Sequence, residues 1–162
     1  MREAIGSTWL IGIVITFIAI FSGFLAYSIS YTKAFRVKNE IINIIEKNEG
    51  FTESNIDLTN VSDATLRDQT STEARAFRFI KSIGYNHSMF DGASNPCKEG
   101  ELQTGGYCLV KYCPNKGSEN DRIYYKVTTF ISLSIPVINV GIRIPITGET
   151  KSLYNDTNDC EI

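Results

Sequence analysis

Histidine is nearly missing from this 162-residue sequence, and the only one, His87, lies in a segment with the composition of a loop. A lone histidine without partner residues predicts neither a catalytic triad nor a histidine-based metal site. The sequence also lacks a glycine-rich phosphate loop, a paired-carboxylate motif and a cluster with metal-ligand spacing. We therefore expect no enzyme, with no catalytic residue, no cofactor and no metal. An excess of positive charge is missing too, since the net charge is −2, which argues against a nucleic-acid partner.

Charge itself is absent from residues 4 to 32, and the run from Trp9 to Tyr27 is strongly apolar. About 20 apolar residues in a helix cross the roughly 30 Å hydrocarbon layer of a bilayer. We predict that residues 1–32 form a single-pass transmembrane helix in the cell membrane, with membrane lipid as a partner. The alternative is a removable secretory signal behind Arg2, but a signal core has only roughly 7 to 15 apolar residues.

The helical pattern continues beyond the apolar run without a glycine or proline as far as Gly50. Ala34, Val37 and Ile41 recur at three- and four-residue intervals, while charged and polar side chains occupy the opposite face. Gly50 is a helix stop, because glycine accepts the left-handed conformation that closes a last turn. We expect one helix from about residue 5 to residue 48, half in lipid and half covered by an apolar surface.

Small side chains recur along one side of the lipid half, at spacings of four, three, four, three and four residues. In lipid there is no hydrophobic drive between helices, so they associate by close backbone approach at small residues. The alternative is that small residues are simply common in membrane helices. We predict a helix-packing face, called here the small-residue face, that comprises Gly12, Thr16, Ala19, Gly23, Ala26 and Ser30.

The remaining sequence is enough for one small domain, residues 33–162, which includes the amphipathic extension of the helix. A second helix is predicted between a capping box at Thr70 and Glu73 and a stop at Gly84. Residues 50–70 and 85–106 have the composition of loops, the first with room for a short helical turn.

Three later segments are rich in Val, Ile, Thr and Tyr and predict an antiparallel three-stranded meander: residues 107–113, 123–135 and 141–154. The apolar face of this sheet is expected to cover the exposed half of the long helix. Pro145 lacks a backbone donor, which places the third strand at a sheet edge or kinks it. The predicted fold class is α+β.

Four cysteines, Cys97, Cys108, Cys113 and Cys160, all lie in the C-terminal half. An even count in a small extracytoplasmic domain predicts disulfides, with three pairings open. We favour Cys97 with Cys108 and Cys113 with Cys160. Residues five apart on a strand point to opposite faces, so Cys108 and Cys113 suit a zinc site poorly.

Two signals for the orientation of the membrane helix disagree. Lys33, Arg36 and Lys38 follow the span, so the positive-inside rule alone puts the C-terminal domain in the cytoplasm. The cysteines favour the other side of the membrane, where disulfides persist. We give the cysteines more weight and predict a cytoplasmic N-terminus and an extracytoplasmic domain.

The whole layout resembles the pilin and pseudopilin class: a charge-poor N-terminal helix, its amphipathic extension, a small antiparallel sheet and a C-terminal cysteine. Within it, the segments Ser134-Ile135-Pro136 and Pro145-Ile146-Thr147-Gly148-Glu149-Thr150-Lys151 look like those of TadE-like minor pilins or pseudopilins. The resemblance implies a pilin-like fold and a subunit of a surface filament or secretion apparatus. Its implied partners are other pilin-like subunits or assembly-platform proteins, including further copies of itself.

Glu3 resembles the acidic residue that pilins carry near the mature N-terminus, where it can offset a neighbouring chain's terminal amine. It lies two residues after Met1, and no leader or prepilin-peptidase site precedes it. We therefore expect either no processing or a protein that stays in the membrane and helps assembly. The alternative is that Glu3 is a solvated residue at the membrane interface.

A second function class stays open beside the filament subunit. It is a single-pass anchor that displays an extracytoplasmic domain for a ligand or a protein partner. Such a domain would need a groove lined by exposed aromatic side chains, for which Tyr124, Tyr125 and Phe90 are the candidates.

Overall fold

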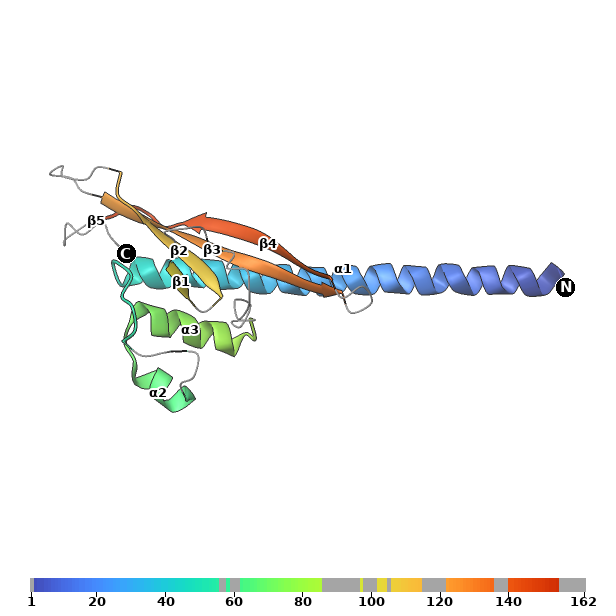
Figure 1. Ribbon diagram of the computed structural model, residues 1–162, viewed down its shortest axis with the longest axis horizontal. Helices are drawn as coiled ribbons and strands as arrows, with labels where there is room; N and C mark the ends of the chain where they lie inside the picture. The colour runs from blue at the N-terminus through green and yellow to red at the C-terminus, as the bar shows by residue number, and fades with distance from the viewer. Residues whose placement is uncertain are drawn as a thin grey trace.

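The fold is seen in a computed structural model that describes residues 2–55, 58, 62–85, 97, 102–104, 106–114, 122–135 and 140–154. A single long helix, α1 (Arg2–Lys47), dominates the molecule and extends far beyond everything that packs on it (Figure 1). It contains a stretch with a mean hydropathy of 2.4, none of it buried, and is long and apolar enough to cross a membrane. This agrees with the predicted helix from about residue 5 to residue 48.

The end of α1 differs from the prediction in one detail. The residue in the left-handed conformation is Glu49, with φ of 55°, and Gly50 does not adopt a positive φ. The amide of Gly50 still donates to the carbonyl oxygen of Ile45, at 3.1 Å, and so closes the last turn. The left-handed residue that ends the helix is therefore one position earlier than the predicted glycine.

The strands form one antiparallel sheet in the order β1-β2-β3-β4: β1 (Leu102–Thr104), β2 (Tyr107–Tyr112), β3 (Arg122–Ile135) and β4 (Val140–Glu149). The predicted three-stranded meander is present as β2, β3 and β4. Strand β1 pairs with β2 inside the segment that was predicted to be a loop. Within the described residues β4 is an edge strand, as Pro145 predicted.

The predicted third strand divides at Thr150, and its end becomes β5 (Leu153–Tyr154), which pairs with the start of β3. Thr150 continues the contact with Tyr125 in a different way, because the Tyr125 amide donates to the Thr150 hydroxyl at 2.9 Å. The Thr150 amide in turn donates to the Tyr125 carbonyl oxygen at 2.9 Å. A side-chain hydroxyl thus replaces a backbone acceptor and ends the regular ladder.

The sheet covers one side of the C-terminal half of α1 and helix α3 (Thr72–Ser82) covers another, which together with α1 from Ala34 onward make up the head (Figure 1). The buried core joins α1 to both, through Val37, Ile41, Ala76, Ile80, Leu109 and Val127. The hydroxyl of buried Thr129 in β3 donates to the Ala34 carbonyl oxygen at 3.1 Å. Burial of these apolar side chains is the main stabilising term of the head.

Strand β4 approaches α1 closely at Gly148. A Cβ atom at that position would lie 2.8 Å from Cδ1 of Ile42 and 2.9 Å from Cδ of Lys38. Contacts under about 3 Å do not occur between real Cβ atoms and their neighbours, so any larger residue here would require the ends of the Ile42 and Lys38 side chains to shift.

Helix α3 begins one residue later than its predicted capping box. The N-cap is Ser71, whose hydroxyl accepts from the Ala74 amide at 3.3 Å, in place of Thr70. Glu73 accepts from the Ser54 amide at 2.6 Å and so fastens the preceding loop. Helix α2 (Asp63–Asp68) is the short turn that the sequence left room for, and Leu66 packs with Phe77 of α3 in a small second core.

Candidate assembly face on the long helix

The small-residue face lies on the part of α1 that the head does not cover. Five of its six residues are exposed, and Ser30, the nearest to the head, is half-buried. A Cβ atom added at Gly12 or at Gly23 would meet no other atom within 4 Å. The predicted helix-packing residues therefore form an open strip along an uncovered helix.

This strip is straight. At about 100° per residue, the six positions fall within an arc of about 80° on the helix surface. The same arc continues into the head, where it contains the buried residues Ala34, Val37 and Ile41, and buried Ile45 lies about 20° beyond its edge. The small-residue face and the face that carries the head are thus one continuous side of α1.

Large apolar side chains border the strip near its N-terminal end. A groove of about 510 Å³ runs along the helix there, lined by Trp9, Gly12, Ile13, Thr16, Phe17 and Ile20. The Thr16 hydroxyl donates to the Gly12 carbonyl oxygen at 2.9 Å, so its donor is satisfied within the helix. Glycine and threonine at the base of the groove allow another apolar surface to approach the backbone.

Aromatic rings mark the level at which the uncharged segment ends. Tyr27 and Tyr31 have ring centroids 6.3 Å apart, and Tyr31 and Phe35 stack at 6.2 Å. The Lys38 ammonium lies over the Phe35 ring at 4.5 Å. Tyrosines and long cationic side chains are the residues that favour a membrane–water interface. The sequence signal for this ladder is a four-residue aromatic repeat, which was overlooked beside the small-residue spacing.

The structure contains one of the two disulfides that we favoured from the sequence. Cys97 is bonded to Cys108 across 11 residues of sequence, with the Cα atoms 5.6 Å apart. Cys113 is also a disulfide-bonded cysteine. Its predicted partner, Cys160, lies outside the described residues, as do His87 and Phe90. Glu3 lies in α1, but its side chain is not among those described.

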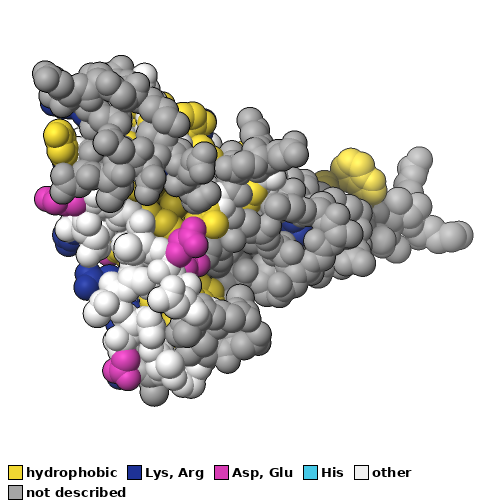
Figure 2. Space-filling view, turned by 60° about the vertical axis from the view of Figure 1, so that its left-hand side comes forward, with side chains coloured by type: hydrophobic (Ala, Val, Ile, Leu, Met, Phe, Trp, Pro, Cys, Tyr) yellow, Lys and Arg dark blue, Asp and Glu magenta, His cyan; other side chains and the backbone are white. Residues whose placement is uncertain are grey.

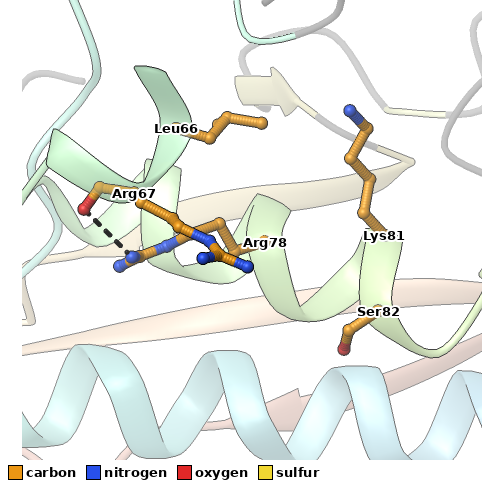
Figure 3. A pocket seen from close by; sticks show the side chains of 5 residues that line it. All are labelled: Leu66, Arg67, Arg78, Lys81 and Ser82. Atoms are coloured by element: carbon orange, nitrogen blue, oxygen red, sulfur yellow. Dashed lines mark hydrogen bonds between the residues drawn. The ribbon is translucent and has the colours of Figure 1, made fainter. Parts of the chain in front are cut away.

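The cleft that the described residues form between α2 and α3 is lined by separated cationic side chains. A cleft of about 410 Å³ between α2 and α3 is lined by Leu66, Arg67, Arg78, Lys81 and Ser82 (Figure 3). Arg78 donates to the Arg67 carbonyl oxygen at 3.3 Å, whereas Lys81 extends away from both arginines, so the three cations do not converge. Basic and acidic side chains are interspersed over the described part of this end of the head (Figure 2).

The titratable groups that are deeply buried are tyrosines. Burial raises the pKa of Tyr85 to about 12, and its hydroxyl accepts from the Phe130 amide at 2.9 Å. Burial also raises the pKa of Tyr107, whose hydroxyl has no hydrogen-bond partner in the described structure. Both groups stay protonated at neutral pH and support the core. No group of three metal-ligating side chains occurs within the described ranges.

The aromatic side chains proposed for a ligand groove separate in the structure. Tyr125 is buried, and its hydroxyl accepts from the Phe51 amide at 3.4 Å. Tyr124 stacks on Tyr112 of the neighbouring strand, with ring centroids 5.1 Å apart. Neither residue lines the clefts described above.

Comparison with known proteins gives no relative: no family model, no curated protein and no solved structure matches this chain.

Proposed function

We propose that this protein is a pilin-like structural subunit or minor pseudopilin of a surface filament or secretion apparatus, and that it assembles through its N-terminal helix. The observation that carries the proposal is the uncovered half of α1 with its straight small-residue face. A helix of this length needs no such face merely to hold a domain in a membrane. The TadE-like segments at residues 134–136 and 145–151 support the same class.

The proposed topology follows from the helix and the disulfides together. Helix α1 is compatible with a single-pass anchor, and the Cys97–Cys108 bond favours an oxidising compartment for the head. The N-terminus is then cytoplasmic and the head extracytoplasmic. In this arrangement the small-residue face lies in lipid, where association depends on close packing.

The head restricts which neighbours can use the small-residue face. Because the head lies on the same side of α1, a parallel neighbour at the same height would place its upper helix inside the head. A neighbour whose helix ends at residue 47 clears residue 33 when it is lower by 14 residues, about 21 Å at 1.5 Å per residue. This offset is a minimum, because β3 and β4 run beyond the Thr129–Ala34 contact toward the N-terminus of α1 (Figure 1). Contact along this face thus favours copies that are staggered along the helix axis, as in a filament.

Site-specific photo-crosslinking in membranes tests this assembly mode. A photoreactive residue at Ala19 or Ala26 is expected to capture a second copy or an assembly-platform protein. The matched control is Phe21, which is equally exposed to lipid but about 180° from the small-residue face. For a staggered copy, mass spectrometry should map crosslinks from position 19 to residues 33–47 of the second copy.

Crosslinks from Phe21 without crosslinks from Ala19 and Ala26 would contradict the proposal. The topology has its own test, in which a membrane-impermeant thiol reagent labels intact cells after reduction. Labelling of Cys113, the least buried of the described cysteines, is expected; protection of Cys113 until the cells are lysed would place the head in the cytoplasm.

A further inference from the structure

A second cleft lies where the uncovered part of α1 meets the head. It has a volume of about 420 Å³ and is lined by Ser28, Ile29, Thr32, Lys33, Arg36 and Ile83. The first five residues belong to α1, and Ile83 is the C-cap of α3. The cleft therefore straddles the end of the uncharged segment, at the level of the aromatic ladder formed by Tyr27, Tyr31 and Phe35.

Two cationic groups line this cleft, and none of its lining residues is acidic. Arg36 is exposed and, within the described part of the chain, forms no hydrogen bond or ion pair, even with Glu40 one turn further on. Lys33 donates to the Gly84 carbonyl oxygen at 3.3 Å. An ammonium group has three donors, so Lys33 retains donors for a second acceptor.

The other walls of the cleft match an amphipathic ligand. Ile29 belongs to the segment of α1 that is proposed to lie in lipid, and its side chain is 58% exposed. Ile83 is half-buried. The Thr32 hydroxyl donates to the Ser28 carbonyl oxygen at 2.8 Å, so its donor is satisfied within the helix. Lys33, Arg36 and Ile83 thus line the cleft toward the head, and exposed Ile29 lines it toward the uncharged segment of α1.

The geometry points to a binding site for the phosphate of an anionic phospholipid, with Arg36 and Lys33 as its ligands and Ile29 and Ile83 against the acyl chains. This inference rests on the proposed membrane anchoring. Arginine pairs with phosphate through two parallel N–H donors, a geometry that a diffuse attraction to an anionic surface does not require. A bound headgroup would fix the depth of α1 and the tilt of the head.

The same helix offers a matched control for the charge. Lys38 lies two residues after Arg36, at nearly the same height but about 200° around the helix, over the Phe35 ring. A diffuse attraction to an anionic surface depends on all three cations alike, whereas a site depends on Arg36 and Lys33 alone. Glutamine at position 38 removes the charge together with the Cδ and Cε methylene groups that lie near Gly148, so urea unfolding of Lys38→Gln must show that the head remains intact.

The test uses the full chain in nanodiscs of phosphatidylcholine with phosphatidylglycerol, and native mass spectrometry counts the anionic lipid retained on the released protein. Arg36→Gln is expected to lower retention about fivefold, and Arg36→Lys to restore part of it. Lys38→Gln is expected to change retention less than twofold. Equal losses in Arg36→Gln and Lys38→Gln would overturn the site in favour of diffuse attraction.

Two further measurements separate the sources of failure. Excess inorganic phosphate should leave lipid retention unchanged, and displacement of the lipid would assign the cleft to a soluble anion and overturn the inference. If alkaline carbonate extracts the unaltered chain from membranes, the proposed membrane anchoring itself is wrong. A chain that resists extraction but retains anionic lipid equally with and without Arg36 would overturn the lipid site alone.

Discussion

The two halves of α1 present one continuous side to different surroundings. From Gly12 to Ala26 that side carries exposed small residues, Ser30 is half-buried at the edge of the head, and from Ala34 to Ile45 the side is fully buried under the head. The change in residue size falls within one turn of the change in surroundings. In water, large apolar side chains gain free energy by burial, whereas in lipid that gain is absent and small residues allow close packing.

Polar groups follow the same division. In the uncovered half, Thr16 and Ser22 donate their hydroxyls to carbonyl oxygens one turn back in the same helix. At the head, Thr129 donates across from β3 to the Ala34 carbonyl oxygen. A helix that satisfies its own polar groups suits a surrounding without water, and the cross-link from β3 suits a packed interface.

The largest expected effect separates two isoleucines of α1. Ile41 is 1% exposed and Ile18 is 58% exposed. Ile41→Ala should destabilise the head by about 4 kcal/mol through lost burial and a cavity, and Ile18→Ala by less than about 0.5 kcal/mol. Urea unfolding in detergent, followed by near-ultraviolet circular dichroism of the tyrosines, measures both.

The only tryptophan, Trp9, reports separately on the other half of the helix. Its emission should stay constant while Ile41→Ala unfolds the head. Equal losses of stability from Ile41→Ala and Ile18→Ala would contradict the claim that only the C-terminal half of α1 is part of the folded head.

Alkaline pH should destabilise the head and spare the uncovered helix. The pKa of Tyr85 is about 12 in the folded head, against an ordinary value of 10.0, because of burial. Since the folded state holds this proton more tightly, its contribution is complete below pH 10 and is lost as the pH rises to 12. The loss from Tyr85 alone is about 3 kcal/mol.

Burial also raises the pKa of Tyr107 and Tyr125, which adds to the effect. Melting temperatures measured between pH 8 and about pH 12 check this prediction. Tyr154→Phe, at an exposed position, is the control and should leave the profile unchanged. A melting temperature that stays level across this range would contradict it.

Long periodic patterns made most of the fold predictable. The helix α1 and the strands β2, β3 and β4 each repeat their apolar pattern over several residues. A single residue of atypical propensity therefore does not hide the pattern. Strand β1 has only three residues and depends on its pairing with β2, so it has no period to detect. The choice of Ser71 over Thr70 as N-cap depends on a distant contact, because the Thr72 hydroxyl lies 2.9 Å from that of Thr52.

The small-residue face was predictable from its spacing, and its alignment with the head was within reach. The intervals that lead from Ser30 to Ala34 and Val37 continue the same series of fours and threes. The interfacial cleft was not predictable, because Ile83 reaches α1 only through the packing of α3. Contacts between elements distant in sequence leave no local signal.

The next prediction enlarges an alanine in each half. Ala34 is fully buried and its carbonyl oxygen accepts from Thr129, whereas Ala26 is exposed on the small-residue face. Ala34→Leu should destabilise the head by about 2 kcal/mol through overpacking. Ala26→Leu should leave urea unfolding of the head unchanged but lower the yield of photo-crosslinks from position 19, because it adds a second enlarged side chain to the face. An unchanged yield of those crosslinks in Ala26→Leu would mean that residue size on this face does not matter.

The smallest effects compare two buried tyrosines of the head, where no helix satisfies the hydroxyl locally. The Tyr85 hydroxyl accepts from the Phe130 amide and lies 3.1 Å from the Gly106 carbonyl oxygen, so Tyr85→Phe leaves buried groups unpaired. Its expected cost is about 1.5 kcal/mol. Tyr107→Phe removes a buried hydroxyl that has no partner in the described structure and should raise stability by about 1 kcal/mol.

Urea unfolding of the two phenylalanine variants resolves these opposite signs, since each is a change of a single oxygen atom in the same core. A loss of stability in Tyr107→Phe would mean that its hydroxyl has a partner after all, such as a buried water near Glu73, whose charge acts on this group. In either case the emission of Trp9 should not respond. The uncovered half of α1 shares none of these contacts, so changes in the core of the head should leave it unaltered.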